Sequence, residues 1–431
     1  MSAAAPFPDR GIIFWPVGTG DSTTIVIDDE CVVQVDLHDM AKADDDLAVA
    51  EVVDRLVEVL PKRDGKPYLG AFILSHADMD HCLGFSNLLE EVTIGELWAT
   101  PRLWREYTED DVALCDDAEA FHQEAKRRVA ATLKAIADGV DVASGDRIRV
   151  VGYDTDHSKH AYSELPDECL SYPGDMVSTI DGIDVSDRLE VFLHAPFKDD
   201  CAAERNDTSV ALQITLKDVD GREGRALLFG DLAYETIKKI FEFSELVERP
   251  ERIAWDVLLA PHHCSKKVMY VVEDGVEVLK QDVLDLFEKH ASVHSTVVVS
   301  SSEFPSSNKV GDNPPHLIAL ARYEEIATEV LCTSEFPNVD DSQPLVFVLG
   351  ENGFVLAALD DVDLESANKS AMASGAALLG GVLMAFAITT VTRNRTGDSR
   401  KLERGLVQVR EAVSGARGEE AAPHQPISFG S

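Results

Sequence analysis

A short stretch of the sequence, LSHADMDHCLGF, places two histidines and two aspartates within six residues. His76, Asp78, Asp80 and His81 come directly after the apolar run Ala71–Leu74. A strand would send alternate side chains to opposite faces, and a helix would spread them around its circumference, so all four converge only in a tight loop that leaves a strand. Converging imidazoles and carboxylates repel one another or lose hydration unless a cation lies between them. The spacing therefore predicts a metal-binding loop.

Two further apolar runs end in residues of the same chemical types. Asp231 follows the run ALLFG, and His262 and His263 follow the run LLAP. Each motif by itself is explained as simply by a surface loop whose polar side chains face water. Taken together, and each after an apolar strand, the three motifs predict one shared site at the edge of a sheet.

Composition limits the classes of protein that fit. The chain has 431 residues, of which 45% are hydrophobic, so it can bury the core of one large α/β domain with a tail, or of two or three average domains. The 78 acidic residues against 39 basic ones give a net charge of −39, which disfavours broad, unaided binding of duplex DNA. The high acidity could equally serve only solubility.

The seven cysteines show no framework spacing, and the N-terminal stretch MSAAAPFPDRG lacks the features of a signal peptide. Reduced cysteines are typical of the cytoplasm. We therefore expect a cytoplasmic main domain.

Strands and helices alternate along the first 360 residues, which predicts a layered α/β protein with two sheets covered by helices. Residues 102–185 have a more polar, less periodic character around one predicted helix, Asp116–Ala137. We interpret this segment as an insertion that forms a lid or a partner surface. A second predicted helix covers Val278–His290, and a predicted strand covers Trp255–Leu259.

Residues 361–431 form a distinct tail. Residues 370–392 carry no charge, and their length suits a membrane-spanning helix. Ala377, Gly381 and Ala385 would give this helix a small-residue face for pairing with another copy. A basic, polar segment follows, which we expect to be partly disordered. Membrane contact, self-association and a helix packed within the domain all remain open.

The order of these motifs resembles the metallo-β-lactamase-fold hydrolases, and most closely the ComEC-type competence-protein branch with its stand-alone relatives. The resemblance extends over about residues 11–359. It is carried by VGTGDS before a strand, VD at Asp36, HADMDH, NDTS at Asn206, FGD at Asp231, APHH at His262 and NPPH at His316. It implies an αββα sandwich, here with an inserted helical segment and a C-terminal apolar helix.

The resemblance also implies roles for individual residues. One divalent ion would be held by His76 and Asp78, a second by Asp80, His81 and His262, with Asp231 between them. Candidates for a further ligand are His263, His194 and Asp207, and Asp36 would orient a ligand without binding the ion itself. Ser265, Lys266 and Asn206 are candidates for binding the substrate, although Ser265 and Lys266 could equally form an exposed turn.

Two ions about 4 Å apart would supply hydroxide for hydrolysis at neutral pH, and the candidate catalytic residues are Asp80, Asp231 and Asp36. The oxygen ligand at Asp78 makes Mn²⁺ a competitor of Zn²⁺. We expect a phosphodiesterase or nuclease whose substrate is a small phosphodiester or a nucleic acid delivered by a partner protein. The alternatives are an ester, lactone or thioester hydrolase, and a metal-bound sensor or scaffold with a partner-binding insertion and a membrane-associated tail.

Overall fold

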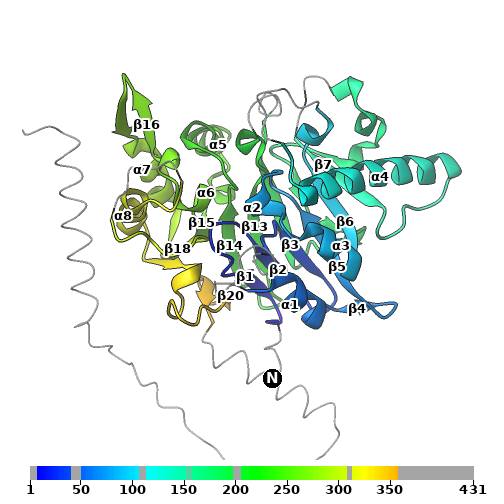
Figure 1. Cartoon of the computed structure of the whole chain (residues 1–431), viewed down its shortest axis with the longest axis horizontal. Coiled ribbons are helices and arrows are strands. Elements are labelled where there is room, and N and C mark those ends of the chain that lie inside the picture. The colour runs from blue at the N-terminus through cyan, green and yellow to red at the C-terminus, as the bar shows by residue number, and fades with distance from the viewer. Residues whose placement is uncertain are drawn as a thin grey trace, which may run out of the picture.

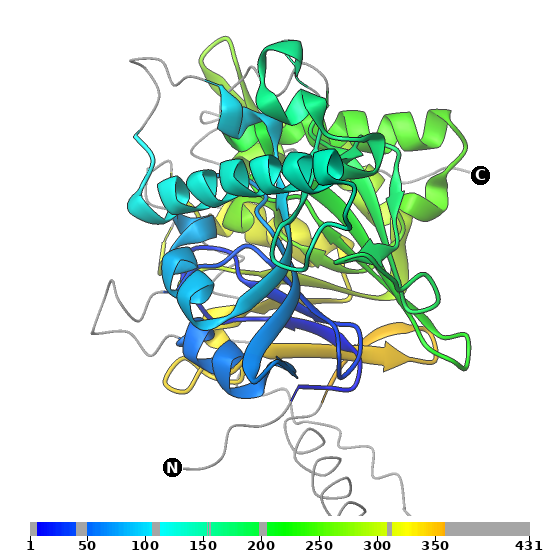
Figure 2. The ribbon, with the colours of Figure 1, turned by 90° about the vertical axis from the view of Figure 1, so that its right-hand side faces the viewer.

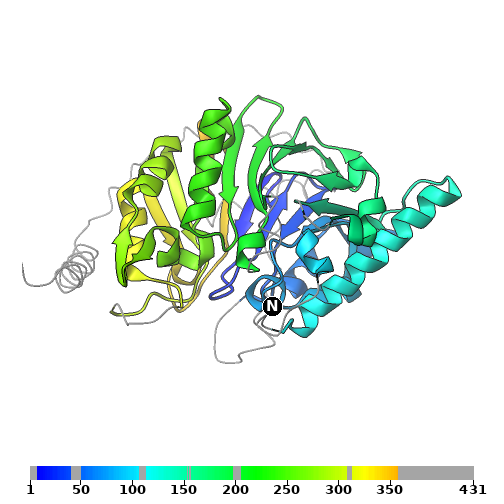
Figure 3. The same cartoon turned by 90° about the horizontal axis from the view of Figure 1, so that it is seen from above.

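The structure is a computed structural model that describes residues 7–39, 50–105, 113–152, 154, 157–197, 205–307 and 313–357. The described chain forms four layers, in which two sheets pack face to face and helices cover both outer faces (Figures 1 and 3). This is the αββα layering that the sequence predicts.

The first sheet has ten strands among the described residues, in the order β21-β20-β1-β2-β3-β5-β6-β7-β8, with β4 paired to β5. The neighbours from β3 to β8 are parallel, and the others are antiparallel. The bounds are β1 Gly11–Phe14, β2 Thr23–Val26, β3 Val32–Val35, β4 Lys62–Arg63, β5 Lys66–Ile73, β6 Thr93–Ala99, β7 Arg147–Val151, β8 Leu170–Ser171, β20 Leu345–Gly350 and β21 Gly353–Leu356.

The second sheet has seven described strands in the order β19-β18-β15-β14-β13-β12-β9. The pairs β14–β15, β15–β18 and β18–β19 are parallel, and the other pairs of this sheet are antiparallel. The bounds are β9 Met176–Val177, β12 Leu189–Ala195, β13 Ala211–Lys217, β14 Glu223–Leu228, β15 Trp255–Leu259, β18 Ala291–Val299 and β19 Glu329–Cys332. Two small hairpins join β10 (Thr179–Ile180) to β11 (Ile183–Asp184) and β16 (Tyr270–Glu273) to β17 (Val276–Leu279).

Helices cover the outer face of each sheet, and Figure 2 shows α3 and α4 lying across the first one. On the first sheet these are α1 (Val52–Val59), α3 (Phe85–Glu91) and α4 (Asp116–Asp138); on the second they are α5 (Tyr234–Leu246), α7 (Gln281–His290) and α8 (Leu317–Ile326). The one-turn helices α2 (Met79–Cys82) and α6 (Pro261–Cys264) follow β5 and β15. Short 3-10 helices include η2 (Pro101–Trp104), η7 (Asn206–Thr208) and η9 (Lys266–Val268).

The central core lies between the two sheets. Val33 and Ile73 from the first sheet pack with Ile214 and Val257 from the second, and all four are fully or almost fully buried. Strands that are buried on both faces carry nearly continuous apolar runs, as WDVLL in β15 does. This double burial fixes the strand ends from which the polar motifs leave.

Several predicted elements are confirmed. The helix predicted over Asp116–Ala137 is α4, which ends at Gly139 in the left-handed conformation, and the strand Trp255–Leu259 is β15. The helix predicted over Val278–His290 is partly wrong, because Val276–Leu279 pairs as a strand and the helix begins at Gln281. A four-residue apolar run fits the periodicity of a strand and of a helix equally well. Only the pairing of Val276–Leu279 with β16 assigns this run to a strand.

The segment 102–185 is built into the sandwich rather than standing apart as a lid. Its strands β7 and β8 extend the first sheet, and β9 pairs with β12 in the second. The role of this segment as a partner surface stays a prediction.

The predicted apolar helix 370–392 lies outside the described residues, which end at residue 357. Among the residues that are described, no helix is both long and apolar enough to cross a membrane.

Candidate metal centre

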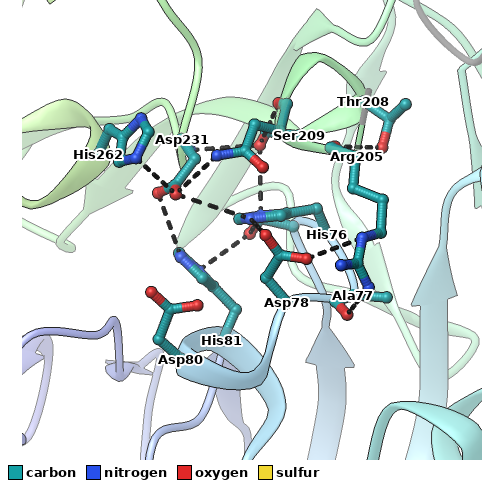
Figure 4. Close-up of polar contacts among 12 residues, drawn as sticks. His76, Ala77, Asp78, Asp80, His81, Arg205, Thr208, Ser209, Asp231 and His262 are labelled. Atoms are coloured by element: carbon teal, nitrogen blue, oxygen red, sulfur yellow. Dashed lines mark hydrogen bonds and ion pairs between the residues drawn. The ribbon is translucent and has the colours of Figure 1, made fainter. Parts of the chain in front are cut away.

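Three loops meet where β5, β14 and β15 end, and together they bring most of the predicted ligands into one cluster (Figure 4). Backbone hydrogen bonds connect these loops to one another and to the segment before β13: His262 N–H donates to the Gly230 carbonyl at 2.9 Å, and Val210 N–H donates to the Ser75 carbonyl at 3.0 Å. The cluster therefore draws on both sheets, and its geometry depends on how they pack.

Asp231 is the centre of the cluster. Its Oδ1 lies 3.2 Å from Nε2 of His81 and 3.5 Å from Nε2 of His263. Its Oδ2 lies 3.8 Å from Nε2 of His76 and 3.5 Å from Nε2 of His262. Each oxygen of this buried carboxylate thus faces its own pair of imidazoles.

The HADMDH loop supplies the ligand types on both sides of Asp231. Asp78 precedes the single turn of α2, and its Oδ2 lies 3.7 Å from Nε2 of His76. Asp80, inside the turn, lies 3.3 Å from Nε2 of His263 through its Oδ2. One turn of helix thus separates the two aspartates to different sides of the shared carboxylate.

The other ring nitrogen of each loop histidine has its own polar partner. Nδ1 of His81 lies 2.8 Å from Oδ2 of Asp36, and Nδ1 of His76 lies 3.1 Å from the Ser75 hydroxyl and 3.3 Å from the Ser209 hydroxyl. A histidine that binds a cation through Nε2 keeps its proton on Nδ1, and such an outer partner fixes that tautomer.

The turn that carries His262 and His263 has an uncommon backbone. Residues His262, His263 and Cys264 have φ values of 51°, 52° and 66°, a region that L-residues seldom occupy. Each such residue costs about 1–3 kcal/mol and persists only where the surroundings enforce it. The ring planes of His262 and His263 are 88° apart. His262 therefore faces Oδ2 of Asp231, and His263 faces Oδ1.

Buried ligand atoms in the cluster have no hydrogen-bond partner within the described part of the chain. They are Nε2 of His76, His81 and His263, together with Oδ1 of Asp231. Ligand atoms of Asp80, His81, Asp231 and His263 all lie within 4.8 Å of one another. Buried polar atoms are rarely left unsatisfied, and a mixed set of imidazoles and carboxylates suits a divalent cation, so the residues fit one.

Charge coupling within the cluster is strong. Burial disfavours protonated His81, but Asp231 and Asp36 outweigh burial and raise its pKa. Burial likewise opposes ionisation of Asp231, yet His263 and His81 hold its pKa well below the usual range. Burial lowers the pKa of His76. The carboxylates thus provide the negative charge that a bound cation needs.

The structure rearranges the ligand assignment that the resemblance implies. His263, and not His262, lies with Asp80 and His81, whereas His262 lies on the side of His76 and Asp78. Sequence reasoning could not separate these neighbours, because the left-handed turn decides where each ring points.

The two other candidates for a further ligand lie differently. His194 is buried, and its Nε2 contacts the carbonyl of Arg252 at 2.8 Å, so the structure does not bring it to the cluster. Asp207 lies in η7. Among the described residues it belongs neither to the group of Asp80, His81, Asp231 and His263 nor to a second group of close ligand atoms from Asp21, Asp36 and His81. Its neighbour Asn206 does reach the cluster, where Nδ2 donates to Oδ2 of Asp231 at 3.2 Å.

The proposed substrate contacts after His263 are not supported. Ser265 is fully buried, and its hydroxyl accepts the Lys267 N–H at the start of η9. The Lys266 ammonium lies 2.5 Å from Glu277 in the β16–β17 hairpin. Because Ser265 is buried and Lys266 is paired with Glu277, neither side chain is free to bind a phosphate.

Sequence reasoning missed several residues at the cluster. Asp21 lies 3.3 Å from Nδ1 of His263, and Arg205 Nε lies 2.9 Å from Oδ1 of Asp78. His38 is buried close to Gly20, and burial lowers its pKa to about 4. The motif GTGDS and the stretch VDLHD were the available signals for Asp21 and His38, whereas Arg205 had none.

Comparisons with known proteins give a distant structural similarity. No family model and no curated protein matches the chain. The solved structures it resembles include a metallo-β-lactamase, MIM-1, from Novosphingobium pentaromativorans, at 14% identity over 59% of this chain and 75% of that one, with a TM-score of 0.28. Another is a metallo-β-lactamase with an HARLDQ motif from Cronobacter sakazakii, at 13% identity over 59% and 74%, with a TM-score of 0.26. The ComEC-type resemblance stays a prediction.

Proposed function

We propose that this chain is a hydrolase that uses two divalent cations and that its substrates are phosphodiesters. One observation carries the proposal: the two oxygens of Asp231 face two separate pairs of histidines, His81 with His263 and His76 with His262. A carboxylate that offers one oxygen to each of two ligand sets is suited to bridge a pair of cations.

The ligand sets indicate which cations fit. Asp78 would join His76 and His262 on one side, and Asp80 would join His81 and His263 on the other. Imidazole nitrogen suits Zn²⁺, while Asp78, Asp80 and Asp231 add the hard oxygen ligands that Mn²⁺ prefers. When bound, such a pair of ions lowers the pKa of water and stabilises the charge that develops on the substrate.

The residues around the ligands would hold them in place during the reaction. Asp36 accepts hydrogen bonds from Ser75 N–H at 2.6 Å and from the Ser75 hydroxyl at 2.7 Å. These two bonds fix the orientation of the carboxylate that contacts His81. Asn206 donates a hydrogen bond to Asp231. The Ser209 hydroxyl contacts Nδ1 of His76 and accepts the backbone N–H of Asp231. Hydrogen bonds of this kind keep the metal-binding side chains oriented.

The preference for phosphodiesters rests on charge. Asp78, Asp80 and Asp231 give the centre more carboxylate than a site built mainly from histidines has, and two cations together attract an anionic phosphodiester. Arg205 beside Asp78 adds a cationic group at the same edge. The net charge of −39 favours a small phosphodiester, or nucleic acid presented by a partner, over unaided capture of long DNA.

The test is a substrate screen on the full chain loaded with Mn²⁺ or Zn²⁺. We expect turnover of bis-p-nitrophenyl phosphate, little turnover of a lactone or a thioester, and loss of activity in Asp80→Ala with its fold retained by circular dichroism. Turnover of only the lactone or thioester would refute the phosphodiester preference. Two bound ions without turnover of any substrate would instead favour a metal-bound sensor or scaffold.

A further inference from the structure

Two thiols meet directly behind the metal-binding loop. The Sγ atoms of Cys82 and Cys115 lie 3.6 Å apart, although the residues are 33 positions apart in the sequence. Cys82 follows His81 in α2, and Cys115 is the N-cap of α4. Both are free cysteines.

The approach of the two thiols is held by other contacts. Both carboxylate oxygens of Asp117, in the first turn of α4, accept backbone N–H groups of Gly84 and Ser86, each at 2.8 Å. These bonds fix the start of α4 against the residues that follow α2. A disulfide has its sulfurs about 2.05 Å apart, so the two atoms need to approach by only about 1.5 Å.

The two sulfurs differ in exposure and reactivity. Cys82 is fully buried, whereas Cys115 is half-buried. A hydrogen bond from Cys82 and the backbone N–H of Ala118 together lower the pKa of Cys115 to about 6. By contrast, burial raises the pKa of Cys31, Cys169 and Cys332. An accessible thiolate next to a second thiol is the arrangement found at redox-sensitive cysteines.

We propose that Cys82 and Cys115 are a redox modification site that closes to a reversible disulfide in the presence of a peroxide. The Cys115 thiolate attacks one peroxide oxygen, the O–O bond breaks, and the released hydroxide takes a proton to form water. The Cys82 sulfur then attacks the sulfur of the Cys115 sulfenic acid, the S–O bond breaks, and the departing hydroxide and the Cys82 proton form a second water. Each sulfur loses one electron, and the peroxide gains two.

The disulfide would act on the metal-binding loop. The Cys82 sulfur lies 3.2 Å from the carbonyl oxygen of Asp78, at the start of the turn that carries Asp80 and His81. Forming the disulfide shortens the distance between the two sulfurs and so draws α2 toward α4, together with Asp80 and His81. We therefore expect weaker metal binding in the oxidised chain, by about tenfold if the loop ligands are misaligned. This second step rests on the proposed function.

The test treats the full chain with a small excess of hydrogen peroxide and maps its peptides by mass spectrometry without reduction. We expect a Cys82–Cys115 linked peptide that dithiothreitol removes. Cys115→Ser should abolish the link, whereas Cys169→Ser, which changes another half-buried cysteine, should leave it. In Cys82→Ser, Cys115 should stop at the sulfenic acid, which dimedone traps.

Each outcome bears on one proposal. Absence of the linked peptide from the folded wild-type chain, or its appearance only after denaturation, overturns the redox site and leaves the hydrolase proposal untouched. A link that forms without any change in Mn²⁺ affinity, measured by titration of the oxidised and reduced chains, confines the site to modification without control of the metal. A link in a chain that hydrolyses no substrate supports the redox site and counts against the proposed function.

Discussion

Nδ1 of His81 lies 2.8 Å from Oδ2 of Asp36. Asp36 directly follows β3, and its backbone has a φ of 54°. Asp36 also accepts two hydrogen bonds from Ser75, the residue before His76. One buried carboxylate thus fixes both the orientation of a predicted ligand and the start of the loop that carries it.

Replacement of Asp36 by Asn should weaken metal binding by about 10–100-fold, because the amide loses the negative charge that favours the Nδ1–H tautomer of His81. The measurement is a Zn²⁺ and Mn²⁺ titration by calorimetry. Asp184→Asn, at the exposed end of β11, is the control and should bind as the wild type does. Equal affinity in Asp36→Asn would show that the contact does not orient a ligand.

Replacement of either His262 or His263 by Ala should reduce the bound metal from two ions per chain to about one, because the two rings lie beside different oxygens of Asp231. Metal content after dialysis, measured by inductively coupled plasma mass spectrometry, checks this. His194→Gln, which keeps an N–H group for the Arg252 carbonyl, should retain both ions. Loss of an ion in His194→Gln, or full loading of His262→Ala, contradicts the assignment.

Replacement of Arg205 by Ala should lower kcat/KM for a phosphodiester by about tenfold or more, because Asp78 loses the partner that lies 2.9 Å from its Oδ1. Arg205→Lys should recover only part of the loss, since lysine keeps the charge but not the planar group. Initial rates at several metal concentrations separate weaker metal binding from a slower reaction. Arg222→Ala, at an exposed turn, is the control and should not change the rates.

Replacement of Gly20 by Ala should lower the free energy of unfolding by about 1–3 kcal/mol. A Cβ at Gly20 would lie 2.0 Å from Nδ1 of His38 and 2.8 Å from the Asp80 carbonyl, so buried groups must move. Urea denaturation of the metal-free chain gives the difference. Gly65→Asn, at an open turn with φ of +83°, changes a glycine without such contacts and should cost less.

The sequence locates the motifs that form the candidate cluster. HADMDH, FGD and APHH each follow a buried strand, and such runs are local, so periodicity and residue type are enough to locate them. The expected layering follows for the same reason, because alternating strands and helices with apolar faces leave few ways to pack. Short elements such as β17 escape this reasoning, since a four-residue apolar run fits a helix or a strand.

What the sequence by itself determines is that imidazoles and carboxylates gather at strand ends. Only the tertiary structure decides which of them face each other. His262 and His263 are neighbours, yet a left-handed backbone that the packed loops enforce turns their rings to opposite oxygens of Asp231. The contacts of Arg205 with Asp78 and of Cys82 with Cys115 join segments far apart in the chain, and no local pattern encodes such distances.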